Sequence, residues 1–364
     1  MFACVCWTPF QILNALNYKL TYRSEEKMDM YICEKFNHAD VIARRLESLK
    51  YVNKVYMVKN LDYDSLGVIK RKVKICKDLF CISKVIKSCV RTPIDLESIT
   101  YSVVVSSGYL NFNILFNNYF CEKGAKSIFI DDGLESYLKK NTSDSYSLIY
   151  RLASKISGNG GIYLLPEELY VYLPEIVEAR GKYKKIGKLP SLTKFPEHIR
   201  KDFNYIFEYE KLVSEYRFLL FDQIGTGDFK NPTFFQMQRN ILEMLLETVG
   251  ENQLLVKMHP RAKKNVYGNE YRTFSTSVPW EIFVMNEHIS NKIFLSITST
   301  ACFTPKIVFG EEPTVIFMYK LFEIENSLVV EEFIQKVRKT YQKPQKVYIP
   351  ESFEELKKVI LELK

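Results

Sequence analysis

Residues 127–133 read SIFIDDG, an apolar run that ends in two aspartates and a glycine. The same pattern occurs in LLVKMHP at 254–260 and in IFLSITST at 293–300. Each apolar run predicts a buried strand, and the polar residues after it predict a turn. Because ligands of open α/β sheets bind beyond the carboxyl ends of the strands, we expect one cleft lined by carboxylates, an imidazole and hydroxyls.

Outward from these three stretches, strand patterns alternate with helical patterns. A chain of 364 residues favours two domains. Alternation predicts parallel sheets with helices on both faces. The expected fold is therefore α/β, with two Rossmann-like, doubly wound domains facing each other across a cleft, as in the GT-B glycosyltransferases. Strands are predicted at 2–7, 30–34, 54–57, 101–106, 125–130, 162–165, 169–173, 218–222, 253–258, 293–297 and 314–317, and helices at 10–22, 38–49, 109–121, 233–249, 279–286, 301–309, 330–340 and 352–363.

The domain boundaries follow from local composition. Residues 181–196 are rich in Lys, Gly and Pro, so 181–200 is expected to be a linker. Residues 1–180 then form the first domain and 201–350 the second. The last helix, within 351–364, is expected to pack back on the first domain, as it often does in GT-B proteins.

The net charge of the chain bears on the partners that the protein could bind. Lys and Arg number 51 against 43 Asp and Glu, which fits an anionic substrate or an anionic membrane surface without proving either. Basic residues within 69–91 predict an amphipathic helix that either lies on lipid headgroups or, as we favour, packs by its apolar stripe. No nucleic-acid partner is expected.

Cysteine usage and the chain start suggest a cytoplasmic protein. The eight cysteines contain no CxxC pair and no zinc-ligand spacing, which indicates reduced thiols. No signal peptide and no apolar stretch of the ~20 residues that a span needs is apparent. Peripheral attachment to the inner face of a bacterial plasma membrane is the alternative to a freely diffusing protein.

The acidic pair is the first candidate site. Asp131 or Asp132 could act as a general base on a sugar hydroxyl, or could cap a helix. Gly133 supplies the unusual backbone geometry of a turn. Asp228, in the loop that includes Gly225-Thr226-Gly227, is a secondary candidate for the base.

Three further positions could hold a nucleotide. His259, fixed by Pro260, could bind a phosphate oxygen and protonate a leaving group, or could be a capping or core histidine. Ser299 and Thr300 open a predicted helix and form an anion site that needs no metal, unless they only cap. Glu281, at the start of another helix, could accept both ribose hydroxyls. Asp62-Tyr63-Asp64 matches a DxD metal motif, but its polar context argues against metal binding.

Together these motifs resemble those of the bacterial sialyltransferases, most closely glycosyltransferase family 52 and the related polysialic acid enzymes. That family has an acidic-acidic-Gly motif, a His-Pro motif and a Ser/Thr pair in this order. Here they are residues 131–133, 259–260 and 299–300, and the opening stretch 6–11, CWTPFQ, also looks similar. Thr300 stands where many relatives carry a second serine, and it keeps the hydroxyl.

The resemblance implies a metal-independent, inverting sialyltransferase that uses CMP-sialic acid and no further cofactor. Its acceptor would be a galactose-terminated oligosaccharide of a capsule or lipooligosaccharide. His259 and Pro260, Glu281, and Ser299 with Thr300 would hold the CMP moiety. The acidic pair would supply the base, although either carboxylate fits. A donor such as CMP-Kdo or a UDP- or GDP-sugar, and a non-catalytic glycan-binding protein, are the alternatives. Linkage and oligomeric state stay open.

Overall fold

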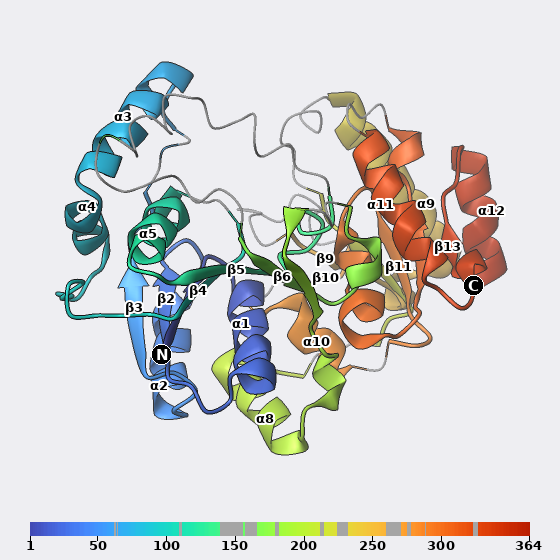
Figure 1. The fold of residues 1–364 in the computed structure, drawn as a ribbon. Helices are drawn as coiled ribbons and strands as arrows, with labels where there is room; N and C mark the ends of the chain where they lie inside the picture. Colours follow the sequence, from blue (N-terminus) through green and yellow to red (C-terminus); the bar gives the residue numbers. More distant parts are fainter. Residues whose placement is uncertain are drawn as a thin grey trace. The chain divides into compact units, whose positions relative to one another are not determined.

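The computed structural model describes residues 1–364 except 62, 64, 109–110, 139–155, 157–165, 179–181, 212–214, 224–231, 260–270, 275–277, 288 and 323–326. It divides into two compact units, each built on one sheet (Figure 1). Unit 1 comprises Met1–Pro190 and Lys194–Glu208. Unit 2 comprises Ser191–Thr193 and Tyr209–Lys364.

The sheet of unit 1 has seven strands in the order β3-β2-β1-β4-β5-β6-β7, and every neighbouring pair is parallel. The strand order reverses between β1 and β4, and such switch points are where open α/β sheets bind ligands. The strands are β1 Phe2–Cys6, β2 Met28–Cys33, β3 Lys54–Val58, β4 Val103–Ser106, β5 Lys126–Ile130, β6 Glu168–Val171 and β7 Lys185–Lys188.

Helices cover both faces of this sheet. Ala3 and Val5 of β1 belong to a core cluster with Phe116 of α5. Phe2 points to the opposite face, where its ring lies 6.3 Å from that of Tyr18 in α1. Burial on both faces explains why the central strands of this sheet are nearly continuous apolar runs. The helices of unit 1 are α1 Pro9–Tyr22, α2 Ala39–Ser48, α3 Val68–Phe80, α4 Ile82–Cys89, α5 Asn111–Glu122 and α8 Glu197–Ile206.

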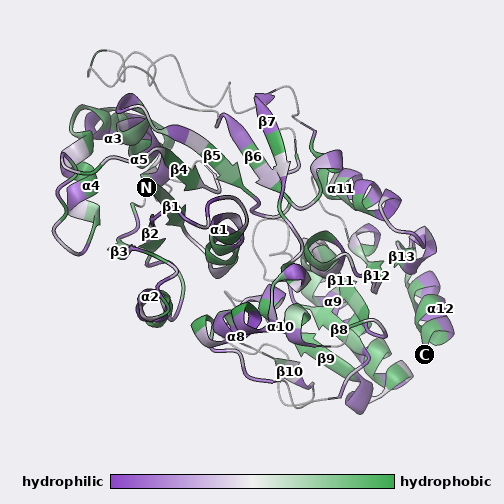
Figure 2. Cartoon of the chain, turned by 60° about the horizontal axis from the view of Figure 1, so that its bottom comes forward, coloured by the Kyte–Doolittle hydropathy of each residue, from purple (hydrophilic) through white to green (hydrophobic). Residues whose placement is uncertain are grey.

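The sheet of unit 2 has six parallel strands in the order β10-β9-β8-β11-β12-β13, with a switch point between β8 and β11. Its central strands are coloured as hydrophobic (Figure 2), and their side chains contribute to the core of the unit. The strands are β8 Phe218–Phe221, β9 Leu254–Lys257, β10 Thr273–Phe274, β11 Ile293–Ser296, β12 Thr314–Phe317 and β13 Val347–Tyr348, and the helices are α9 Pro232–Val249, α10 Trp280–Asn286, α11 Ser327–Lys339 and α12 Phe353–Leu363.

The predicted connection at 181–200 contains regular structure. Its residues Lys185–Lys188 form β7, an edge strand paired with β6, and α8 begins at Glu197. The lysine-rich composition suggested a connection without regular structure, but lysine is also common in edge strands. The glycine has a packing role as well, since a Cβ at Gly187 would stand 2.3 Å from the Tyr170 ring.

Three other elements differ from expectation. The basic segment is two helices, α3 and α4, which meet at Cys81. The helix predicted at 301–309 is a 3₁₀ turn, Thr300–Phe303, followed by a π-helical turn, Pro305–Phe309. The terminal helix α12, expected to pack on the first domain, packs against α9, and its Leu356 and Ile360 lie in the core of unit 2. The short strands β10 and β13 were not predicted.

Among the residues that the structure describes, no helix combines the length and the apolar character that a membrane crossing requires.

Candidate functional site

Asp131 directly follows β5 and is 1% exposed. Its Oδ1 accepts a hydrogen bond from the backbone N–H of Gly133 (2.8 Å), and its Oδ2 accepts from the N–H of Tyr172 (3.2 Å) and from the Tyr137 hydroxyl. Burial raises the pKa of this carboxyl to about 6, although the three hydrogen bonds oppose the shift. Asp131 therefore ties the turn after β5 to the end of β6.

The turn itself has the form that the sequence predicts. Gly133 has a φ of 76°, the left-handed region that glycine tolerates best. The bond from Gly133 N–H to Asp131 Oδ1 closes a local side-chain turn, which is a common role of aspartate. Because Leu134 forms a β-bridge and residues 135–138 form turns and a bend rather than a helix, the helix-cap interpretation of the acidic pair does not apply.

Asp132 has a different environment. It is half-buried, and its Oδ1 accepts a hydrogen bond from Gln11 Nε2 at 2.9 Å. The Gln11 Oε1 in turn accepts from the backbone N–H of Trp7 at 2.7 Å. One amide side chain thus links the loop after β1 to the turn after β5, and it orients the Asp132 carboxylate at the carboxyl edge of the sheet.

Gln11 belongs to a buried polar stripe on α1. Gln11, Asn14 and Asn17 are each at most 1% exposed and recur every three residues, so they share one face of the helix. Asn14 Nδ2 donates to the carbonyl of Asp131 (2.8 Å), and Asn14 Oδ1 accepts from the Tyr172 hydroxyl (2.7 Å). This stripe was not predicted, although three amides at spacing three in an apolar helix are its signal in the sequence.

In unit 2 the carboxyl ends of β9, β8 and β11 lie side by side. The backbone N–H of His259 donates to Asp222 Oδ2 at 3.1 Å, which joins the ends of β9 and β8. Thr298 Oγ1 donates to Gln223 Oε1 at 3.2 Å, which joins β11 to β8. Since neighbouring strands are about 4.8 Å apart, the ends of β9 and β11 are roughly 10 Å apart. The structure therefore brings His259 and the Ser299-Thr300 pair to one edge.

Lys257, the last residue of β9, places a cation beneath this edge. Its side chain is 9% exposed, and its Nζ lies 5.9 Å from the ring centroids of both Phe221 and Trp280. Burial lowers the pKa of Lys257, while the charges of Glu281 and Asp222 oppose that shift. Across the described ranges Lys257 makes no ion pair with an acidic side chain.

Glu281 stands near Lys257 because α10 is anchored at the same edge. Trp280, the first residue of α10, donates a hydrogen bond from Nε1 to the carbonyl of Ala301 (3.1 Å). Its indole also packs edge-on against Phe221 at 5.2 Å. Glu281 is 9% exposed. Glu281, which the sequence predicts to bind the ribose hydroxyls, is thus close enough to Lys257 for its charge to affect the pKa of that lysine.

The side chains of Ser299 and Thr300 are half-buried at the start of the segment that follows β11. Ser299 does not cap the following turn with its side chain, and neither hydroxyl forms a hydrogen bond within the described part of the chain. The backbone N–H of Ser299 is held by Ser296 Oγ at 2.6 Å. A short 3₁₀ turn follows instead of an α-helix, and the two hydroxyls are candidate donors to an anion.

Some predicted positions fall outside the described residues. They are Pro260, Asp228 with the loop Gly225-Thr226-Gly227, and the two aspartates of the DxD look-alike, Asp62 and Asp64. No role was predicted for Asp222, Gln223 or Trp280, which connect the neighbouring strand ends. The available signal for Asp222 was an acidic residue directly after a buried strand, the same pattern that identified the pair at 131–132.

Comparison with known proteins gives matches of structure but none of sequence. No protein-family model and no curated protein matches the sequence. The crystal structure of the glycotransferase of kitacinnamycin superposes with a TM-score of 0.56 at 10% identity, covering 100% of this chain and 90% of that one. The UDP-GlcNAc 2-epimerase of Methanocaldococcus jannaschii, in complex with UDP-GlcNAc and UDP, gives 0.48 at 13% identity, with coverages of 99% and 92%. UGT2 of Phytolacca americana, complexed with UDP-2fluoro-glucose and pterostilbene, gives 0.48 at 9%, with coverages of 99% and 89%.

The fold is therefore α/β, with two parallel sheets of seven and six strands, and it is of the GT-B type.

Proposed function

We propose that this protein is a glycosyltransferase that uses a nucleotide-activated sugar, and more specifically an inverting, metal-independent sialyltransferase that uses CMP-sialic acid. One observation carries the proposal. At the carboxyl edge of the second sheet, an imidazole, two unused hydroxyls, a buried ammonium and a buried carboxylate gather around the strand-order switch point. These cationic and hydrogen-bonding groups suit a phosphate, and the carboxylate suits the hydroxyls of the ribose joined to it.

The second unit is assigned the donor. The Ser299 and Thr300 hydroxyls would donate to the phosphate, His259 would stabilise or protonate it as it leaves, and Glu281 would accept the ribose hydroxyls. Lys257 would add a positive charge from below the edge. A nucleoside monophosphate carries less charge than a diphosphate, so these donors would suffice without a divalent cation.

The first unit is assigned the acceptor. Asp132 would take the proton of an acceptor hydroxyl, because Asp131 is buried and its carboxylate is occupied by three hydrogen bonds. The acceptor oxygen then bonds to the anomeric carbon of sialic acid, the bond from that carbon to the CMP oxygen breaks, and its electron pair leaves with CMP. One displacement inverts the configuration.

A transfer assay tests the proposal. Purified protein, CMP-sialic acid and a galactose-terminated oligosaccharide in EDTA should yield a sialylated product. His259→Ala and Asp132→Asn should each lower kcat by about 10² or more, because each removes a group that acts on charge developing in the transition state. His198→Ala, at an exposed position in α8, is the matched control and should retain activity.

Other outcomes would select a different function. Full activity of His259→Ala would refute its role. Thermal stabilisation by UDP or GDP, but not by CMP, would favour a transferase with another donor. Acceptor binding without affinity for any nucleotide would indicate a non-catalytic glycan-binding protein.

A further inference from the structure

Helix α3 has two apolar faces, and only one of them is buried. Ile75 and Leu79, four residues apart, are 3% and 0% exposed and belong to the core of unit 1. This face accounts for the packing of the helix, as expected for an ordinary surface helix.

The second apolar face is open. Ile69, Val73 and Phe80 are 79%, 49% and 54% exposed, and Cys76 is partly exposed. Their spacings of four, three and four residues place them on one side of the helix, about a quarter to a third of a turn from the buried face. A single exposed apolar residue needs no explanation, but a continuous exposed stripe along three turns usually marks a contact surface.

Cations surround this stripe. Residues 68–89 contain seven Lys or Arg and a single acidic residue, Asp78. Asp78 is buried, paired with Lys74 at 2.6 Å, so it offers no negative charge to a partner. An excess of six positive charges in these 22 residues is most of the +8 of the whole chain. The charges nearest the stripe are Lys70, Lys72 and Lys77.

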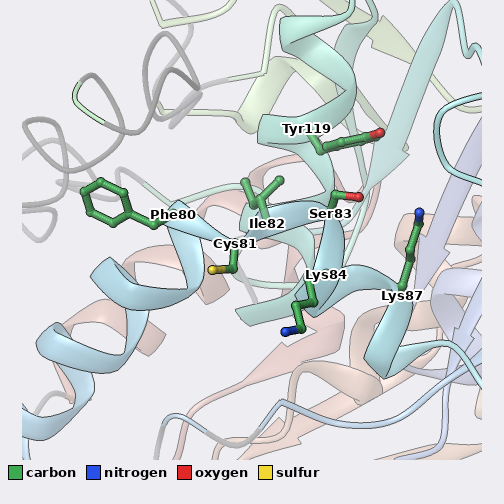
Figure 3. A pocket seen from close by; sticks show the side chains of 7 residues that line it. All are labelled: Phe80, Cys81, Ile82, Ser83, Lys84, Lys87 and Tyr119. Atoms are coloured by element: carbon green, nitrogen blue, oxygen red, sulfur yellow. The ribbon is translucent and has the colours of Figure 1, made fainter.

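A hollow lies where α3 meets α4. Its volume is about 560 Å³, and it is lined by residues from the end of α3, the start of α4 and Tyr119 of α5 (Figure 3). Phe80 and Ile82 are apolar members of the lining, and Lys84 and Lys87 are its cations. Lys87 is engaged with Glu97 at 2.7 Å, whereas Lys84 is exposed on α4 and forms no ion pair within the described residues.

From these observations we propose that the α3 face, defined as Ile69, Val73 and Phe80 with Lys70, Lys72 and Lys77, docks on an anionic lipid membrane. Lysines near a membrane are attracted to acidic lipids, and the apolar stripe enters the boundary between headgroups and acyl chains. A protein partner is disfavoured because lysine is depleted at protein interfaces, which rely on geometrically paired polar groups. The surface uses none of the residues assigned to transfer.

Vesicle sedimentation of the full-length protein tests this inference. The protein should sediment with vesicles of three parts phosphatidylcholine to one part phosphatidylglycerol, but not with pure phosphatidylcholine. Raising salt from 0.1 M to 1 M should release it, because the Debye length falls from about 10 Å to 3 Å. Ile69→Ser with Phe80→Ser, and separately Lys70→Gln with Lys77→Gln, should each weaken binding at least tenfold. Both pairs are exposed, so the core is untouched.

Controls use exposed positions elsewhere. Leu328→Ser on α11 and Lys357→Gln with Lys358→Gln on α12 remove similar groups and should leave vesicle binding unchanged. Transfer to a soluble acceptor, or nucleotide binding, should be equal in all variants, which separates this proposal from the proposed function. No sedimentation with acidic vesicles, equal sedimentation with neutral ones, or unaltered binding of both α3 variants would overturn the inference.

Discussion

At the scale of single residues, two consecutive aspartates in one turn have opposite environments. Asp131 is 1% exposed and accepts three hydrogen bonds, whereas Asp132 is half-buried and is oriented by Gln11. A buried carboxylate that is already satisfied holds the backbone in place. Asp132, beside it in the same turn, is the carboxylate that we propose as the base.

Asp131 should give unit 1 a measurable pH dependence. Its pKa is about 6 in the folded protein against 3.8 ordinarily, so the folded state binds this proton more tightly. The contribution of this proton to the free energy of unfolding is complete below the pKa of the carboxyl in the unfolded chain, and it is lost as the pH rises through about 6. The free energy of unfolding of the wild type relative to Asp131→Asn should therefore increase by about 2 kcal/mol between pH 7 and pH 4.

Urea unfolding followed by circular dichroism at pH 4, 5, 6 and 7 measures this difference, in which titrations shared by both proteins cancel. A difference that is flat, or that grows toward pH 7, would show that Asp131 is not a buried carboxyl of raised pKa.

At the scale of elements, α1 positions the acidic turn. Its amide stripe contacts residues far away in the sequence: Gln11 bonds Asp132 and Asn14 bonds the carbonyl of Asp131. Helix α10 has the equivalent task in unit 2, where Trp280 fixes it to the segment after β11. In both units a helix holds the strand ends that carry the candidate chemistry, because strand ends alone have few packing contacts.

Gln11 is accordingly predicted to be a positioning residue for the base. Gln11→Ala removes the bond to Asp132 and the bond from Trp7 N–H, and a small misplacement of a reacting group can cost up to about 10² in rate. We expect kcat to fall by about tenfold or more, while the affinity for CMP is unchanged.

Asn17→Ala provides the comparison. Asn17 lies on the same stripe but bonds Tyr172 and the Pro190 carbonyl. This variant should lose stability of about 1 kcal/mol and retain kcat. Equal losses of kcat in both variants would mean that the stripe acts only through stability.

At the scale of the whole molecule, the chain is two units with separate hydrophobic cores. Each sheet has its own switch point and its own set of polar residues at the carboxyl edge. A ligand stabilises the folded state that it binds by RT ln(1 + [L]/Kd), which is about 2.7 kcal/mol at a concentration of 100 Kd. If the second unit binds the nucleotide, we expect the ligand to stabilise mainly the folded state of that unit.

Hydrogen exchange with and without saturating CMP locates the effect. Amide protection should increase in β8, β9 and β11, while β1, β4 and β5 should exchange as before. Protection confined to the strands of unit 1 would reverse the assignment of donor and acceptor. The same comparison with Ser299→Ala and Thr300→Ala combined should show protection only at higher CMP concentrations.

The sequence by itself determined the elements and the order of the motifs. Apolar periodicity and the polar residues at strand ends are local properties, so the strands before 131, 259 and 299 could be predicted, as could parallel sheets of the GT-B type. Only the tertiary structure decided which aspartate is buried, that Gln11 reaches Asp132 across 121 positions of sequence, and that Lys257 lies beside Glu281. It also showed that the lysine-rich segment predicted as a connection contains the strand β7. These features depend on contacts between distant segments, and the burial that such contacts create cannot be inferred from local patterns.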